Sequence, residues 1–375
     1  MTQLKKFGFG LMRLPTTSDK LEDIDMERFK EMADFFIDRG YGHFDTAWIY
    51  HSGKSESAFR EAVVKRHPRN KFTLTDKMPI FSIESEEQMA EVFDEQLARC
   101  GVDYFDFYWI HSINERNYEK ALKYKAFDFV VKKKEGGKIK NIGFSFHDSA
   151  DFLDKILANH PEMAYVMLQI NYLDWEDKNI QSRKCYEVAR KHNRLIFVME
   201  PLKGGSLINV PPDVEELLKS HNNSVSPASW AFRYAASLEG VVNILSGVSN
   251  MKQLKENLDI FDNMEPLTDE EYKVLERAAD LILAEKVIPC TICHYCTDTC
   301  PQNIAIPEYF TIYNTFKRMN EKPTIEIFAY LRNLLASRGK PSDCIDCGHC
   351  ESACPQNIPI VENLGIISEK WETAK

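Results

Sequence analysis

The sequence predicts an α/β protein in which a closed barrel of eight parallel strands, the (β/α)8 or TIM-barrel architecture, precedes a small and mainly helical domain. Up to about residue 262, short apolar runs alternate eight times with amphipathic helices. No glycine-rich dinucleotide fingerprint follows the first run, which disfavours an open doubly wound sheet. Eight of the ten cysteines lie from Cys290 onward, so the last part of the chain has a separate chemistry.

The eight expected strands are short runs rich in β-branched and aromatic residues. They cover residues 7–11, 41–46, 71–76, 104–111, 140–145, 165–170, 195–200 and 241–247. Helices are expected between them wherever apolar residues recur at three- and four-residue spacing, and glycine closes several of these stretches. The clearest such helices cover residues 26–40, 55–67, 85–101 and 179–192.

Composition excludes several classes of protein. The chain is 44% hydrophobic and 28% charged, which is ordinary for a soluble protein. Its net charge of -10 argues against nonspecific nucleic-acid binding. No apolar run approaches the length of a membrane span, and the N-terminus has no signal-peptide core, so we expect a cytoplasmic protein without membrane contact. Cys100 and Cys185 fall in helical patterns and are expected to be buried apolar residues.

Four polar residues fall at or just after successive expected strands. They are Asp45, Tyr50, Lys77 and His111. Taken singly, Asp45 could be a helix cap and Tyr50 a residue on the barrel rim. Lys77 could likewise be a solvated lysine and His111 a core histidine. Because chemistry in such barrels lies at the carboxyl ends of the strands, the four together predict one catalytic site.

This set of residue types suits the reduction of a carbonyl group, which requires a proton for the oxygen as hydride reaches the carbon. A free phenol titrates near about pH 10 and is too weak an acid alone. An adjacent ammonium lowers that pKa, which assigns Tyr50 as general acid and Lys77 as the group that tunes it. Asp45 would then hold the lysine, and a neutral His111 would orient the carbonyl oxygen.

Residues 4–262 resemble the aldo-keto reductase family. The matching stretches are FDTAWIYHSGKSE, TLTDK, FDFYWIHS, KIKNIGFSFHDS, LQINY, MEPLKGG and SGVSNMKQLKEN. The resemblance implies that Ser145 and Gln169 hold the nicotinamide carboxamide. It also implies that the turn 201–205 covers the pyrophosphate and that the loop 246–257 holds the adenosine end. The residues expected to contact the cofactor there are Pro201, Leu202, Gly204, Ser246, Gly247, Ser249, Gln253 and Asn257.

Two residues depart from the pattern of this family. Met199 stands where the family often has an aromatic ring stacked on the nicotinamide, and Phe146 stands where a polar residue is usual. The adenosine loop also lacks the usual basic pair, so both NADP(H) and NAD(H) stay open as cofactors. A flavin (FMN) at the phosphate end of the barrel is a further alternative, since a flavin exchanges electrons both singly and in pairs.

The cysteine-rich part contains two nearly identical runs, CTICHYCTDTCP from Cys290 and CIDCGHCESACP from Cys344. Both have the spacing C-x2-C-x2-C-x3-C-P that is typical of bacterial ferredoxins with two [4Fe–4S] clusters, whereas zinc sites normally use two cysteine pairs. In this pattern the fourth cysteine of each run binds the cluster of the other run. One cluster is therefore expected on Cys290, Cys293, Cys296 and Cys354, and the other on Cys344, Cys347, Cys350 and Cys300.

The stretch between the two runs is too long for a compact ferredoxin. Residues 306–319 and 324–339 are periodic as helices, which favours the helical type of ferredoxin-like domain. The expected domains are thus a barrel over 1–265, a linker helix over 266–288 and a ferredoxin-like domain over 289–375.

The sequence as a whole predicts an oxidoreductase of aldo-keto reductase type. It would transfer hydride between a nicotinamide and a small carbonyl or alcohol substrate, with the clusters serving electron transfer to a redox partner protein or redox control. The alternative is an electron-transfer or regulatory protein whose barrel binds a nucleotide, with or without a flavin, and turns over no carbonyl substrate.

Overall fold

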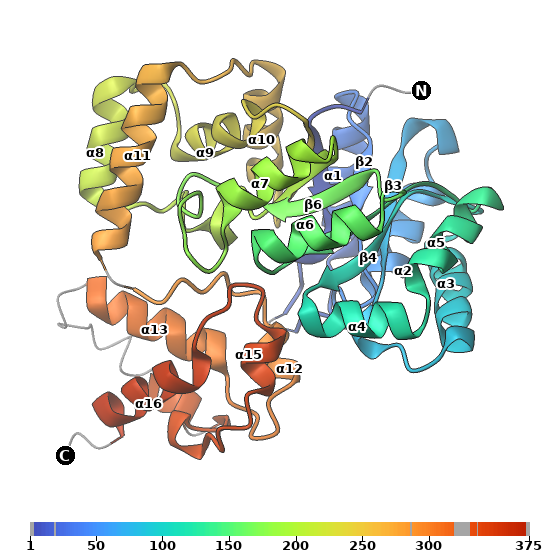
Figure 1. Ribbon diagram of the computed structural model, residues 1–375. Coiled ribbons are helices and arrows are strands. Elements are labelled where there is room, and N and C mark those ends of the chain that lie inside the picture. The colour runs from blue at the N-terminus through green and yellow to red at the C-terminus, as the bar shows by residue number, and fades with distance from the viewer. Residues whose placement is uncertain (1–3, 19, 286, 319–330, 336, 373–375) are drawn as a thin grey trace. The chain divides into compact units, whose positions relative to one another are not determined.

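The computed structural model describes residues 4–18, 20–285, 287–318, 331–335 and 337–372. The chain forms two compact units (Figure 1). The first unit comprises Met1–Leu202 and Ala228–Tyr272, and the second comprises Lys203–Pro227 and Lys273–Lys375. No helix of the described residues is long and apolar enough to cross a membrane.

The first unit contains a closed barrel of eight parallel strands that follow one another in chain order. The barrel closes where β1 pairs with β8, with Phe7 opposite Ile244 and Gly10 opposite Gly247. The expected fold class is therefore confirmed. The strands are β1 (Phe7–Gly10), β2 (His43–Asp45), β3 (Thr73–Met78), β4 (Phe105–Ile113), β5 (Ile139–Phe146), β6 (Tyr165–Gln169), β7 (Leu195–Met199) and β8 (Val241–Gly247).

Helices connect the strands of this unit. The helix expected over 55–67 is shorter in the structure, since α2 continues as a π-turn only to Val64. The helices are α1 (Met26–Asp38), α2 (Ser55–Phe59), α3 (Glu86–Cys100), α4 (Glu115–Lys123), α5 (Ala126–Glu135), α6 (Ala150–Asn159), α7 (Ser182–Lys191), α9 (Pro227–Ala236) and α10 (Met251–Asp262).

Helix α3 shows how local sequence sets these boundaries. The Ser85 side chain caps its first turn by accepting a hydrogen bond from the Gln88 N–H. Glu86 and Glu87 place negative charge at the positive end of the helix dipole. Gly101 ends the helix with φ of 69°, a left-handed conformation in which a side chain would be strained.

The interior of the barrel is filled by side chains and is not a pore. Side chains alternate along a strand, so the residue two positions beyond an interior residue also faces the interior. On β4, His111 is thus the next interior residue after Trp109 toward the carboxyl end of the strand. On β6, Gln169 follows Met167 in the same way. The interior cluster consists of Phe107, Trp109, Met167, Phe197 and Leu245.

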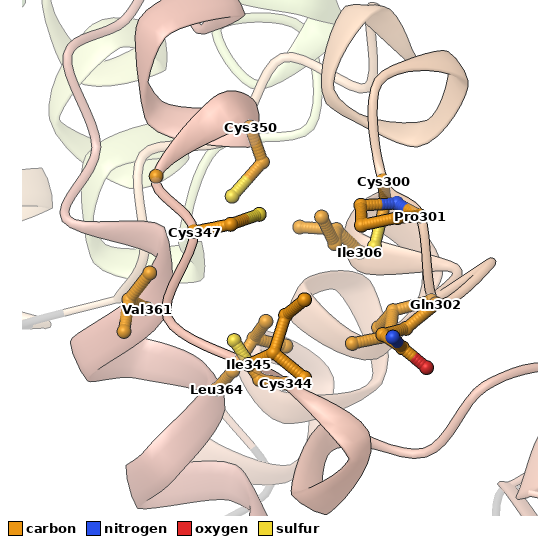
Figure 2. A pocket seen from close by; sticks show the side chains of 12 residues that line it. Cys300, Pro301, Gln302, Ile306, Cys344, Ile345, Cys347, Cys350, Val361 and Leu364 are labelled. Carbon is orange, nitrogen blue, oxygen red and sulfur yellow. The ribbon is translucent and has the colours of Figure 1, made fainter.

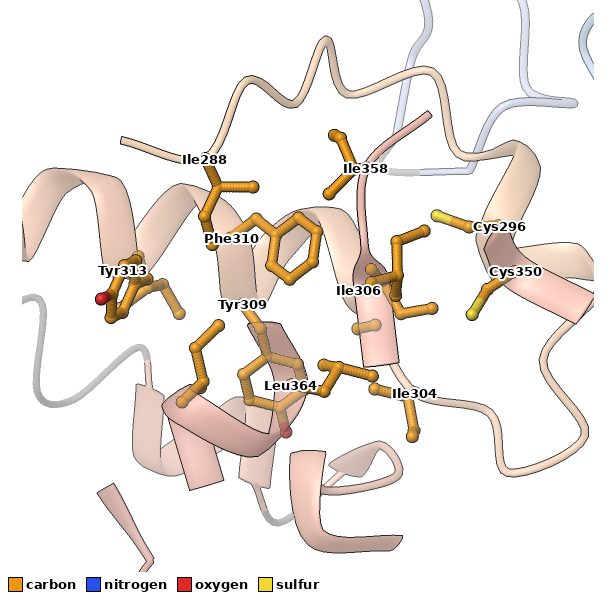
Figure 3. Close-up of a cluster of buried hydrophobic side chains, with 14 of the residues drawn as sticks. Ile288, Cys296, Ile304, Ile306, Tyr309, Phe310, Tyr313, Cys350, Ile358 and Leu364 are labelled. Atoms are coloured by element: carbon orange, nitrogen blue, oxygen red, sulfur yellow. The ribbon is translucent and has the colours of Figure 1, made fainter. Parts of the chain in front are cut away.

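The second unit is mainly helical, with one isolated parallel bridge between Ile304 and Gly339 in its described part. The expected helix over 306–319 is present as α13, while half of the expected helix over 324–339 lies outside the described residues. Its core includes Ile304, Ile306, Tyr309, Phe310 and Leu364, together with Cys296 and Cys350 (Figure 3). The helices are α8 (Pro212–His221), α11 (Asp269–Ala284, which starts in the first unit), α12 (Tyr295–Asp298), α13 (Ile306–Arg318), α15 (His349–Ala353) and α16 (Ile360–Trp371).

Candidate functional site

Lys77 and Asp45 form a buried ion pair at the ends of neighbouring strands of the barrel. Lys77 Nζ donates to Asp45 Oδ1 at 2.5 Å and to the Thr46 carbonyl oxygen at 2.7 Å. The exposed fraction is 1% for Lys77 and 3% for Asp45. Burial raises the pKa of Asp45, and the Lys77 ammonium opposes that rise. The lysine is thus held in one position by two oxygen atoms.

Tyr50 lies in the turn after β2, five residues beyond Asp45. Its hydroxyl oxygen accepts from Lys77 Nζ at 3.5 Å, and its half-buried ring stands edge-on to His111 with centroids 6.3 Å apart. The structure therefore brings together the four side chains that the sequence singled out. His111 lies two residues before the end of β4 and Lys77 one residue before the end of β3, whereas Asp45 ends β2 and Tyr50 lies beyond it.

His111 is an uncharged imidazole in this surrounding. Burial, with smaller contributions from Lys77 and His147, lowers its pKa well below the ordinary histidine value. Its Nδ1 atom and the Oδ2 atom of Asp45 are buried and have no hydrogen-bond partner among the residues that the structure describes. A polar atom left in this way is a place for a ligand atom or a water molecule.

Ser145 and Gln169, which were expected to hold a carboxamide, lie on the neighbouring strands β5 and β6 and are both buried. The Ser145 hydroxyl accepts from the Ser112 N–H at 2.7 Å. The Gln169 amide donates to the Asp174 carboxylate at 2.7 Å. Asn171 donates to the same Asp174 oxygen at 2.7 Å, so a small polar network fixes the Gln169 side chain.

The expected adenosine loop folds around its own polar residues. Asn257 donates to the Ser246 hydroxyl at 3.3 Å, and Gln253 accepts from the Ser249 N–H at 2.8 Å. A Cβ atom at Gly247 would lie 3.0 Å from the Cβ atom of Arg13. Arg13 thus brings a cation to a loop whose own sequence lacks the basic pair. The sequence did not indicate this contact, because Arg13 lies far from the loop along the chain.

The expected pyrophosphate turn is divided between the two units. Pro201 and Leu202 are buried in the first unit, whereas Gly204 belongs to the second. Gly204 has φ of 62°, and a Cβ atom there would lie 2.6 Å from the carbonyl oxygen of Thr291. Close backbone packing inside the second unit is therefore sufficient to require glycine at this position.

His51 is a structural residue that the sequence did not single out. Its Nε2 atom accepts from the Leu14 N–H at 3.0 Å, and its Nδ1 atom bonds to the Leu21 carbonyl oxygen at 2.6 Å. The ring ties a distant loop to the turn that carries Tyr50. The sequence feature that could have pointed to His51 is its position directly after Tyr50.

The two cysteine runs adopt the same backbone conformation. Ile292 and Asp346, each two residues after the first cysteine of its run, have φ of 56° and 55°. His294 and Gly348, each two residues further on, have φ of 64° and 69°. Because unusual conformations recur at equivalent positions, the two runs share one local backbone structure.

The eight cysteines line two separate cavities in the described part of the second unit. One is lined by Cys300, Cys344, Cys347 and Cys350, whose sulfur atoms surround a common space (Figure 2). The other is lined by Cys290, Cys293, Cys296 and Cys354. The fourth cysteine of each run thus joins the three of the other run, which is the arrangement that the ferredoxin spacing predicts.

The chemistry of these thiols fits a bound cluster. Four cysteine side chains line each cavity, which is the ligand set that a [4Fe–4S] cluster requires. Burial raises the pKa of Cys350 to about 11 and also raises the pKa of Cys296 and Cys354. The described residues contain no group of three or more His, Cys, Asp or Glu side chains close enough to hold a single metal ion. Cys100 and Cys185 are both buried in the first unit, as expected.

Comparison with known families accounts for both units. The model of the aldo/keto reductase family matches residues 6–280, which is well over half of the chain. The chain belongs to the aldo/keto reductase family. A second match, to a 4Fe-4S dicluster domain, covers residues 289–358. The fused architecture expected from the sequence is therefore confirmed.

Individual relatives of the chain are distant in sequence. A 9,11-endoperoxide prostaglandin H2 reductase of Trypanosoma cruzi is 26% identical over 243 residues, covering 64% of this chain and 78% of the relative. The holo form of aldo-keto reductase AKR11C1 from Bacillus halodurans has a TM-score of 0.60 at 21% identity, covering 73% of this chain and 92% of that one. An aldo/keto reductase from Klebsiella pneumoniae in complex with NADP and acetate has a TM-score of 0.56 at 18% identity, covering 73% and 91%. At these identities the structures show a shared fold.

Proposed function

We propose that the barrel reduces a small carbonyl compound to an alcohol, or catalyses the reverse reaction, with a nicotinamide nucleotide as cofactor. The observation that carries this proposal is the contact of Lys77 with both Asp45 and Tyr50 in one buried cluster. Membership of the aldo/keto reductase family supports it.

In this proposal Tyr50 gives its proton to the carbonyl oxygen. An ammonium group beside a phenol stabilises the phenolate, so Lys77 makes Tyr50 ready to release the proton. Asp45 and the Thr46 carbonyl oxygen hold Lys77 so that its charge stays close to the phenol. The nicotinamide, when bound, supplies the hydride, and the added hydride and proton together convert the carbonyl to an alcohol.

His111 orients the carbonyl in this scheme. Because burial lowers its pKa well below the ordinary value, the ring is neutral near pH 7 and carries one N–H. That N–H would donate to the carbonyl oxygen as negative charge develops there. A charged imidazolium beside the Lys77 ammonium would instead be destabilised by repulsion.

We assign the nicotinamide carboxamide to Ser145 and Gln169. Both are buried on adjacent strands and carry hydrogen-bonding groups of the kind that a carboxamide requires. We take NADP(H) or NAD(H) in preference to FMN, since a barrel of this fold from Klebsiella pneumoniae was solved with NADP.

For the second unit we propose that the two clusters hold electrons one at a time for exchange with a redox partner protein. The barrel chemistry moves electrons in pairs, and two clusters together match one pair in number. The paired cavities lined by four cysteines each support this role.

The test is a search for a substrate under anaerobic conditions. Small aldehydes, ketones and sugars are offered to protein with full iron content, together with NADPH or NADH, and both nucleotide oxidation and alcohol product are measured. We expect the amount of oxidised nucleotide to equal the amount of alcohol formed. A protein that binds nucleotide and carries both clusters, yet reduces none of these compounds, would instead favour the regulatory alternative.

A further inference from the structure

A buried lysine in the second unit lies next to one of the two cluster cavities. Lys203 begins the short turn Lys203–Gly205, and only 5% of its surface is exposed. Its Nζ atom donates to the Gln356 side-chain oxygen at 3.4 Å. Gln356 is itself 4% exposed and lines the cavity that also contains Cys290, Cys293, Cys296 and Cys354.

The residue after Lys203 packs against the same cavity wall. A Cβ atom at Gly204 would lie 2.6 Å from the Thr291 carbonyl oxygen and 2.7 Å from its Cα atom. Thr291 is buried, lines the cavity and lies between the first two cysteines of its run. These two contacts place the turn against the wall of this cavity, and the Lys203 ammonium reaches that wall through Gln356.

The other cavity has a different electrostatic surrounding. Among the described residues neither lining contains a lysine or an arginine, and only the lining of the first cavity contains a histidine, His294. The Asp346 carboxylate lies 3.6 Å from the Cys344 sulfur. The equivalent position in the first run is Ile292, which carries no charge. Besides its cysteines, the titratable side chain in the lining of the first cavity is His294, which lies 3.8 Å from Glu308. The Glu351 carboxylate also acts on Cys354 of this cavity.

These differences bear on electron affinity. A [4Fe–4S] cluster with four thiolate ligands is anionic, and each reduction by one electron adds a further negative charge. Net charge around a cluster is one of the factors that set its reduction potential. A buried cation stabilises the reduced form and raises the potential, because Coulomb interactions are strong where water is excluded. A nearby carboxylate lowers the potential.

We propose that Lys203 raises the reduction potential of the cluster on Cys290, Cys293, Cys296 and Cys354 above that of the cluster on Cys300, Cys344, Cys347 and Cys350. The first electron that enters this unit from an external reductant then resides on the cluster beside Lys203. The two clusters have distinct roles, with the cluster beside Asp346 as the stronger reductant. This inference rests on the binding of both clusters and is independent of the carbonyl chemistry of the barrel.

The experiment is a redox titration of the full chain, followed by electron paramagnetic resonance after iron and sulfide have been measured. The wild type is expected to show two one-electron steps. Lys203→Met removes the charge and keeps the length of the side chain, so the upper midpoint should fall while the lower one stays. Lys203→Arg should keep the upper midpoint near its wild-type value. Lys219→Met, at an exposed lysine of α8, is the matched control and should shift neither step.

Several outcomes would overturn the inference. Two clusters that titrate at one potential contradict it, as does a Lys203→Met midpoint equal to that of Lys219→Met. A raised dissociation constant for NADPH in Lys203→Met with unchanged midpoints would assign Lys203 to the nucleotide instead. Should Lys203→Met bind less iron, Lys203→Gln decides the question, since it removes the charge but keeps a group that can hydrogen-bond to Gln356, and it should lower the upper midpoint alone. Low iron in the wild type would reject cluster binding itself, which separates that failure from this one.

Discussion

Lys77 Nζ donates to Asp45 Oδ1 at 2.5 Å in a part of the barrel where both side chains are almost wholly buried. Taking two charges from water is costly, and the cost is offset only while both partners remain. Loss of either side chain therefore removes the stabilising effect of the whole ion pair. The same Lys77 atom contacts the Tyr50 hydroxyl, so the ion pair also sets the charge beside Tyr50, the proposed general acid.

Lys77→Met should reduce both stability and activity. It leaves the Asp45 carboxylate buried without its cation, and breaking such a pair typically costs about 3–5 kcal/mol of unfolding free energy. Carbonyl reduction should fall by about 10²–10⁴-fold, because the phenol loses the charge that assists its proton release. Urea unfolding and kcat measure the two effects.

The double variant Lys77→Met/Asp45→Asn separates those effects. It removes the uncompensated charge and should recover much of the lost stability without recovering activity. A double variant that regains wild-type kcat would show that Lys77 acts only in folding.

Gly204→Ala should impair the second unit more than Gly205→Ala. Both glycines have positive φ, 62° and 97°, so both substitutions strain the backbone by about 1–2 kcal/mol. Only at Gly204 would the new Cβ atom overlap Thr291, whereas Gly205 has nothing within 4 Å. The iron retained after purification and the unfolding of the second unit measure the difference. Equal behaviour of the two variants would contradict the close packing of this turn against Thr291.

Cys300→Ala should damage the cluster of the other cysteine run. Cys300 lines the cavity of Cys344, Cys347 and Cys350, not that of its own run. Iron content should fall, and the paramagnetic signal that remains should be that of the cluster beside Lys203. Cys185→Ala, at a buried cysteine of the barrel, should retain all iron. Loss of the cluster on the Cys290 run instead would mean that each run is self-contained.

His43 should make the barrel sensitive to acid. Burial lowers its pKa to about 3, and its ring lies against Phe107 and Phe197 inside the barrel. The unfolded chain takes up a proton below about pH 6.5 while the folded barrel does not. The stability that this group contributes is therefore present above that pH and is lost as the pH falls toward 3.

The magnitude of this effect is about 1.4 kcal/mol per pH unit over that window. His43→Gln should reduce the slope of unfolding free energy against pH, measured by tryptophan fluorescence in urea between about pH 6 and pH 4. His221→Gln, at an exposed position on α8, serves as the control. Unchanged slopes in His43→Gln would contradict a neutral buried His43.

The features that the sequence predicted well are those with short-range signals. Alternating apolar runs predicted the strands, and the position of Lys77 and His111 near strand ends predicted that they would meet. The spacing within the cysteine runs predicted the cross-over of Cys300 and Cys354 between cavities, since ligand geometry imposes that spacing.

The features that the sequence did not predict depend on contacts between distant segments. Arg13 lies beside Gly247, and His51 ties the Leu14–Leu21 loop to the Tyr50 turn. The sequence indicated only that Lys203 belongs to a turn, whereas the folded chain shows it buried beside Gln356. Such contacts are set by packing and register, which leave no periodic pattern along the chain.

The measurement that tests the central claim most directly is kcat for carbonyl reduction by Tyr50→Phe. The substitution removes the proposed acid and leaves the ring to pack against His111 as before. We expect kcat to fall by about 10²–10⁴-fold, with little change in the dissociation constant of the nucleotide. Tyr124→Phe, at the end of α4, should retain wild-type kcat. Reduction at the wild-type rate by Tyr50→Phe would show that the cluster of Asp45, Tyr50, Lys77 and His111 is not the catalytic centre.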